Sequence, residues 1–324
     1  MHRQMSWAVG WMVCLAAGAI SAQEVPREPE DSAVKPLELG DAAPEWHASA
    51  WLNGEAPSIE GARVRPVRVL VFLMTGFSPS LDTVPVLTKL QRQHAEVGLE
   101  VLGFSAEDVE KLRAFVAAQG DKLGFRMAHD EGSRTRRAYM LAFGERSIPQ
   151  AFVVDTKNRI VWHGHPLDGL DETVAQVLAG TYDLDTAKKV EQAIKQVPAY
   201  FDAAYAGDHE KAAKLGVRLM EGLAKNPKQL ARFAYGILID PKLKSRDLDL
   251  ASKAAQQAYD ATGGKLLAAQ ISQARALFAL GRFSDAVEVQ TAAAANAPEG
   301  RVREQMEQIL ADYRKAATQP EAGK

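Results

Sequence analysis

Two patterns of apolar and polar residues divide the chain. Between residues 37 and 183, short apolar runs alternate with segments in which apolar residues recur every three or four positions. The runs are typical of buried strands, and the recurring pattern is typical of amphipathic helices. This alternation predicts an α/β domain with a central mixed sheet flanked by helices. We expect strands at residues 68–74, 99–104, 125–128, 151–154 and 159–162, and helices at 81–97, 107–119, 133–141 and 170–179.

Local polar residues refine these boundaries. Ser105 precedes the helix expected at 107–119 and is a plausible N-cap, because a serine oxygen can accept a free helical N–H. The run Asp155–Asn158 joins two strands and predicts a hairpin turn, since Asp and Asn tolerate turn dihedrals. The polar residues 129–131 and the arginines within 134–137 are expected to form a solvated loop and helix face.

The composition and the apolar pattern change after residue 186, where alanine becomes abundant and no strand pattern remains. Short apolar stripes at helical spacing predict an all-helical domain over residues 186–318. Two segments, 205–213 and 280–288, share a glycine, an aromatic residue or histidine two positions later, and an alanine three positions after that. Such internal similarity is typical of stacked helical hairpins, each unable to bury its apolar face alone.

The second of these segments resembles the tetratricopeptide repeat (TPR). Gly281, Phe283, Ala286, Ala293 and Pro298 occupy the preferred positions of that repeat. The resemblance implies about three helical hairpins followed by a final helix. An irregular helical bundle remains the alternative.

The first residues have the pattern of a targeting segment. Arg3 precedes an apolar stretch that extends to residue 20, and small residues end it at Ala22. This pattern predicts a signal peptide over residues 1–22, cleaved after Ala22, and a periplasmic or secreted protein without stable membrane insertion. Retention of the segment as an anchor remains the alternative. Residues 23–36, rich in Glu, Pro and Asp, are expected to be a flexible linker.

Composition narrows the possible functions. The 324 residues are 47% hydrophobic and 25% charged, which fits a globular chain of about two domains. The net charge of −2 provides no strong field for binding nucleic acid. The one cysteine, Cys14, lies in the predicted signal peptide, so the mature chain would contain none. That excludes intramolecular disulfides and multi-cysteine zinc sites, and we expect no cofactor.

Several motifs occur in the order of a known family. Residues 39–46 read Leu-Gly-Asp-Ala-Ala-Pro-Glu-Trp, residues 147–155 read Ser-Ile-Pro-Gln-Ala-Phe-Val-Val-Asp, and residues 160–166 read Ile-Val-Trp-His-Gly-His-Pro. Together they resemble the exported thiol-disulfide reductases of the TlpA type and their AhpC/TSA (redoxin) relatives. The resemblance covers about residues 39–183 and implies a thioredoxin-like fold with a cis peptide bond at Pro149.

The loop that carries the chemistry of this family differs here. The family has Cys-x-Pro-Cys after the first long strand, and the corresponding residues are Phe77, Ser78, Pro79 and Ser80, preceded by Gly76. The peroxiredoxin alignment places its reactive cysteine at Leu81, which also lacks a thiol. Because thiol-disulfide exchange and thiol peroxidase chemistry both require a thiolate, we expect neither activity.

The resemblance also implies a binding surface that needs no thiol. In this fold the residue before the cis-proline, here Ile148, can pair its backbone with an extended peptide. Phe77, Ile148 and Pro149 are therefore candidate peptide-docking residues, although Phe77 could simply fill space. We expect a protein or peptide-binding scaffold module whose partner the sequence does not name.

Two enzymatic alternatives remain besides membership in an oxidoreductase family. Ser78 or Ser80 could serve as the nucleophile of a hydrolase, because the loop resembles the strand-to-helix turn of such enzymes. His163 and His165 could bind a metal ion together with Asp168 or Asp171. The glycine and proline beside the histidines disturb strand geometry, so we expect no metal site.

Overall fold

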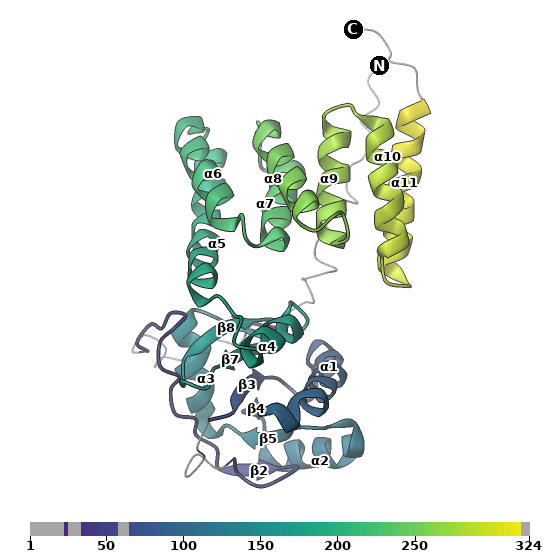
Figure 1. The fold of residues 1–324 in the computed structure, drawn as a ribbon. Coiled ribbons are helices and arrows are strands. Elements are labelled where there is room, and N and C mark those ends of the chain that lie inside the picture. The colour runs from purple at the N-terminus through teal and green to yellow at the C-terminus, as the bar shows by residue number, and fades with distance from the viewer. Residues whose placement is uncertain (1–22, 25–33, 58–64, 319–324) are drawn as a thin grey trace. The chain divides into compact units, whose positions relative to one another are not determined.

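The computed structural model describes residues 23–24, 34–57 and 65–318. The predicted signal peptide, residues 1–22, and most of the predicted linker lie outside the described residues. The chain forms two compact units that meet in sequence between Ala187 and Lys188. We describe each unit by itself (Figure 1).

A six-stranded sheet forms the centre of the first unit, with the strand order β2-β5-β4-β3-β7-β8. β3, β4 and β5 run parallel to one another, whereas β2 is antiparallel to β5, β7 to β3 and β8 to β7. The strands are β2 (Ala50–Leu52), β3 (Val67–Phe72), β4 (Leu99–Ser105), β5 (Arg126–His129), β7 (Gln150–Val154) and β8 (Ile160–Gly164). This mixed sheet confirms the predicted α/β fold class.

Helices cover both faces of this sheet. Residues of β3 alternate between two hydrophobic cores, with Val69 and Val71 in one and Leu70 and Phe72 in the other. The first core includes side chains of α1, α2 and α4, and the second includes Tyr139 of α3. The helices are α1 (Ser78–His94), α2 (Val109–Gln119), α3 (Arg134–Tyr139) and α4 (Leu170–Leu178), with short 3₁₀ turns at η2 (Ala95–Val97), η3 (Gly120–Lys122), η4 (Glu131–Ser133) and η5 (Leu141–Phe143).

Helix α2 begins later than the sequence suggested. Its N-cap is Asp108, whose carboxylate accepts the N–H groups of Glu110 and Lys111 at 3.0 and 3.1 Å. The prediction of Ser105 as N-cap was wrong. Ser105 is the last residue of β4, and its hydroxyl instead contacts Glu107.

The polar segment before α3 is also less solvated than predicted. Asp130 is buried, and its carboxylate accepts the N–H groups of Thr135 and Arg136 at 2.8 Å each. Arg136 itself is buried. The carboxylate therefore replaces water at the start of the helix, which composition alone does not reveal. The hairpin turn at Asp155–Asn158 is present, and the Asp155 N–H donates to the carbonyl of Arg159 at 2.9 Å.

The second unit is helical throughout the part that the structure describes. Its helices are α5 (Leu184–Tyr205), α6 (His209–Leu223), α7 (Pro227–Ile239), α8 (Leu248–Ala261), α9 (Leu267–Ala279), α10 (Phe283–Asn296) and α11 (Arg301–Thr318). They confirm the all-helical class. The TPR assignment of these helices stays a prediction.

The boundary between the units falls inside a continuous helix. α5 begins at Leu184, and both Leu184 and Ala187 pack against the cores of the first unit. The sequence boundary was placed at residues 183–186 because alanine becomes frequent there. The structure instead assigns the first turn of α5 to the first unit, since its apolar side chains complete the core of that unit.

A short strand pair lies outside the six-stranded sheet. β6 (Ser147–Ile148) pairs antiparallel with β1 (Gln23–Glu24), with Gln23 opposite Ile148 and Glu24 opposite Ser147. Gln23–Glu24 were expected to belong to the flexible linker. They form a strand because pairing with an open strand edge needs backbone groups and no apolar period.

Candidate functional site

The degenerate loop, residues 76–80, replaces the Cys-x-Pro-Cys motif of the related family. It lies between the end of β3 and the start of α1 (Figure 1). Phe77 is the N-cap residue of α1 with extended backbone dihedrals, and its side chain makes no capping hydrogen bond. Ser78 and Pro79 form the first turn, and the carbonyl of Phe77 accepts the N–H groups of Ser80 and Leu81 at 2.9 and 3.2 Å. The two positions predicted to replace cysteines therefore lie in one turn at a helix N-terminus.

The predicted docking residues gather around one hydrophobic core. Ile148 is buried in that core, and Phe77 packs against it while remaining partly exposed. Pro149 is buried, and the Ile148–Pro149 peptide bond is cis, as the resemblance implies. The side chains of Ile148 and Pro149 thus offer little surface to a ligand. Only the exposed part of Phe77 and the backbone of β6 could contact one.

Ser80 is placed as a structural group. Its side chain is fully buried, and its hydroxyl oxygen accepts the N–H of Met74 at 3.2 Å. A buried hydroxyl that already accepts a backbone N–H cannot reach a substrate outside the domain. Ser78 is exposed, but none of the hydrogen bonds described in the structure joins it to a histidine or a carboxylate. The geometry does not favour a serine hydrolase.

An acidic residue that sequence reasoning missed lies beside the loop. The carboxylate of Glu107 accepts the N–H of Thr75 and the hydroxyl of Ser105, and it forms an ion pair with Lys111. Burial raises the pKa of Glu107, but the hydrogen bonds from Lys111, Thr75 and Ser105 outweigh it and hold the pKa below the ordinary value of 4.5. Glu107 is therefore a fixed anion that orients the turn before Phe77.

The sequence order of the strands indicates that Glu107 lies near the loop. β3 and β4 are parallel neighbours, so their carboxyl ends meet at the same edge of the sheet. A polar residue just after β4 is expected to lie near the loop that follows β3. Lys111, one helical turn later, approaches the same loop, and a Cβ added at Gly76 would lie 3.6 Å from its Nζ.

The two histidines considered as metal ligands have other contacts. His163 Nδ1 lies 3.1 Å from Glu145 Oε1, and its ring packs against Phe143 at a centroid distance of 4.7 Å. His165 Nδ1 accepts the N–H of Leu167 at 3.2 Å. Among the described residues, no group of three or more His, Cys, Asp or Glu is arranged to hold a metal ion.

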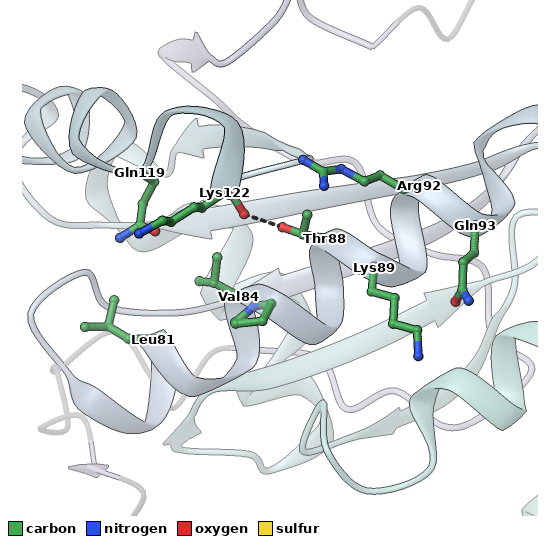
Figure 2. A pocket seen from close by; sticks show the side chains of 9 residues that line it. Leu81, Val84, Thr88, Lys89, Arg92, Gln93, Gln119 and Lys122 are labelled. Carbon is green, nitrogen blue, oxygen red and sulfur yellow. Dashed lines mark hydrogen bonds between the residues drawn. The ribbon is translucent and has the colours of Figure 1, made fainter.

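A surface depression of about 540 Å³ lies along α1, next to the loop rather than within it (Figure 2). Thr88 donates its hydroxyl to the carbonyl of Lys122 at 2.9 Å across this depression. The lining residues contain no carboxylate, histidine or cysteine, so they offer no acid-base pair. They are Leu81, Val84, Pro85, Thr88, Lys89, Arg92, Gln93, Gln119 and Lys122.

Comparison with known proteins agrees with this architecture. The AhpC/TSA family matches the chain over residues 39–163. No protein of curated function matches the sequence. In the described residues, no helix is both long enough and apolar enough to cross a bilayer.

Several solved structures are similar to less than half of this chain. One is a thioredoxin-like protein in the oxidised form, with 20% identity and a TM-score of 0.37, covering 45% of this chain and 100% of its own. Another is a putative thiol:disulfide interchange protein DsbE from Chlorobium tepidum, with 19% identity and a TM-score of 0.36, covering 44% and 99%. A third is a putative protein disulfide isomerase from Bacteroides thetaiotaomicron, with 17% identity and a TM-score of 0.38, covering 44% and 91%.

The first unit is thus a thioredoxin-like domain, and residues 39–163 within it match the AhpC/TSA family. The matched region contains no cysteine, because the one cysteine of the chain is Cys14. The second unit is an all-helical region joined through α5.

Proposed function

We propose that this protein is an exported, redox-inactive binding module whose thioredoxin-like domain takes up an extended segment of a protein partner. The partner pairs its backbone with β6 at Ile148 and contacts Phe77. The helical unit provides a second surface for proteins, as TPR-like arrays do. The protein needs no cofactor, and nucleic acid is not a ligand.

The pairing of β6 carries this proposal. β6 is a two-residue strand that lies outside the six-stranded sheet, and it accepts an extended segment from a distant part of the chain. Its edge therefore has the geometry for strand addition, in which backbone hydrogen bonds provide affinity. Phe77 adds a partly exposed aromatic side chain that packs against the same hydrophobic core as Ile148, and aromatic anchors often dominate the affinity of interfaces.

The residues at the loop support the proposed absence of thiol chemistry. Disulfide exchange proceeds through a mixed disulfide and needs an attacking thiolate. Phe77 has no nucleophile, and Ser80 is buried with its oxygen accepting the Met74 N–H. Export after cleavage at Ala22 would also remove Cys14, which leaves no thiol in the mature chain.

Peptide selection tests the binding role. Random twelve-residue peptides displayed on phage are selected against the chain from Gln23 and against the chain from Val34, which lacks β1 but keeps the described sheet and cores. Selected peptides are then synthesised with N-methyl groups at successive positions. We expect methylation at alternate positions to abolish binding, because backbone N–H groups pair with β6. Failure to select any peptide on either chain would overturn the binding role.

Two variants locate the contact and test the chemistry. Phe77→Ala should weaken selected peptides about tenfold, because it removes an aromatic anchor. Leu81→Ala, at an exposed apolar position in the next turn of α1, is the matched control and should change binding less than about twofold. Insulin reduction and peroxide consumption by the mature chain should stay at the buffer rate. Turnover in either assay would overturn the redox-inactive assignment.

A further inference from the structure

We infer that the chain carries its own competitor for the partner, with Gln23–Glu24 occupying the β6 edge as an autoinhibitory strand. This inference rests on the proposed binding role of that edge. It starts from the pairing of Gln23 with Ile148 and of Glu24 with Ser147. Within the described part of the chain, β1 is the strand that pairs with β6.

Occupation by β1 and by a partner cannot occur together. Each backbone N–H and C=O on this edge can serve one strand, because the ladder requires them to face a single neighbour. Consecutive residues of a strand point these groups to opposite sides, so β1 and a partner would both need the groups of the one β6 residue that faces this edge. A partner must therefore displace β1, and β1 lowers the affinity of the edge for every extended ligand.

The pair is short enough to be displaced. It spans two residues on each strand, whereas isolated two-stranded pairs are marginal even when longer. A partner strand longer than two residues can form more backbone hydrogen bonds than β1 does, and it can also contact Phe77. The autoinhibitory strand therefore disfavours the binding of short or weakly pairing segments and allows longer ones to bind.

Tethering makes the short strand effective in spite of this weakness. Residues 25–36 connect β1 to the rest of the domain in the sequence, and a short connection within one chain gives an effective concentration of about 1 mM. If the free segment binds the edge with a Kd of about 0.1 mM, the tethered strand occupies about nine edges in ten. An external peptide then binds about tenfold more weakly than it does to an open edge.

Cleavage of the predicted signal peptide during export would leave the autoinhibitory strand at the N-terminus of the mature chain. The predicted cut after Ala22 makes Gln23 the first residue of the mature chain. The pairing strand is then a free chain end, so it can leave and return without unfolding any other element. β1 belongs to the two-stranded pair and not to the six-stranded sheet, so its release leaves that sheet intact.

The test uses one probe and four mature chains. The probe is a fluorescein-labelled peptide of residues 23–31. The chains are the wild type from Gln23, the double variant Gln23→Pro with Glu24→Pro, the double variant Gln23→Ala with Glu24→Ala, and the chain from Val34. Proline at position 24 removes a backbone amide N–H that a ladder strand offers, whereas alanine at that position keeps it.

We expect the proline variant and the chain from Val34 to bind the probe about tenfold more tightly than the wild type and the alanine variant. Amide exchange at the β6 residue whose N–H faces β1, either Ser147 or Ile148, should be faster in the proline variant than in the alanine variant. Equal binding by all four chains would overturn the inference. So would a concentration-dependent dimer lost in the proline variant, because the strand would then come from a second copy.

The same experiment separates this inference from the proposed function. If the chain from Val34 binds phage-selected peptides but not the probe, the autoinhibitory strand is overturned and the binding role stands. If it binds neither, the binding role fails as well.

Discussion

The hydroxyl oxygen of Ser80 accepts the backbone N–H of Met74 at 3.2 Å, which ties the first turn of α1 to the residues that follow β3. Thr83 continues this arrangement by donating its hydroxyl to the Ser80 carbonyl at 2.7 Å. Ser80 is fully buried. Ser80, which corresponds to the second cysteine of the family motif, therefore stabilises the loop. The loop forms an ordered turn at a helix N-terminus without thiols.

Restoring both thiols should restore redox chemistry if the turn has kept the geometry of its relatives. In the mature chain, Phe77→Cys with Ser80→Cys should form an intramolecular disulfide and reduce insulin in the presence of dithiothreitol. Position 77 is the N-cap of α1, and a helix N-terminus lowers a thiol pKa below about 8.5, which increases the thiolate fraction.

Mass spectrometry after oxidation should show the loss of two hydrogens in this double variant. The single variant Ser80→Cys should remain a free thiol and show no turnover, because it lacks the exposed partner. Two alkylatable thiols after oxidation of the double variant would contradict the prediction.

The sequence predicted the fold more completely than the site. Strands and helices were found because their apolar periods are local, and β3 and α1 lie where these periods placed them within a few residues. The role of Glu107 was missed because its contact with Thr75 depends on β4 lying beside β3. β1 was missed because a two-residue strand has no period and its partner lies far along the chain.

Glu107→Gln should destabilise the first unit at neutral pH. The variant loses the ion pair with Lys111 and weakens the hydrogen bonds from Thr75 and Ser105. Hydrogen bonds to charged groups contribute about 1.5–3 kcal/mol, and the remaining amide oxygen still accepts one of them. We expect a loss of about 1–2 kcal/mol in the free energy of unfolding, measured by urea titration at pH 7.

The pH dependence gives a second readout for Glu107. Because its folded pKa lies below the unfolded value near 4.5, its stabilisation is present above 4.5 and is lost as pH falls through the folded pKa. The gap between wild type and Glu107→Gln should therefore close in acid. Glu110→Gln, on an exposed position of α2, is the control and should cost less than about 0.5 kcal/mol. A gap that stays constant down to pH 2 would contradict this account.

Tyr139→Phe should change how the stability of the first unit depends on pH above 10. Tyr139 is fully buried and donates its hydroxyl to the carbonyl of Pro44 at 2.7 Å. Burial raises the pKa of Tyr139 far above the ordinary value of 10, and the charge of Arg68 offsets only part of this. Its contribution is thus present below pH 10 and is lost as pH rises above 10, because the unfolded tyrosine ionises first.

The phenylalanine variant should lose about 1 kcal/mol at pH 7, since the Pro44 carbonyl loses its donor. Above pH 10 its stability should fall less steeply than that of the wild type. Unfolding of the thioredoxin-like unit by guanidinium at pH 7, 10 and 11 measures both effects. Parallel stability curves for the two proteins across this range would count against the buried phenol.

Gly222→Ala tests the close approach of the first two helices in the helical unit. A Cβ at Gly222 of α6 would lie 2.6 Å from the Cβ of Ala193 on α5, and both atoms are fixed to their backbones. The helices must separate, which costs about 1–3 kcal/mol, while the gain in helix propensity returns about 1 kcal/mol. We expect a net loss of about 1 kcal/mol, seen as a lower Tm of the helical unit.

Gly236→Ala in α7 is the matched control for this contact. Its added Cβ would lie 3.0 Å from Cζ of Phe201, the end of a side chain that can rotate away. The strain is therefore smaller, and the gain in helix propensity should cancel most of it, leaving the Tm nearly unchanged. If Gly222→Ala instead raised the Tm, as a glycine replacement does in an unobstructed helix, α5 and α6 would not meet through Ala193 and Gly222.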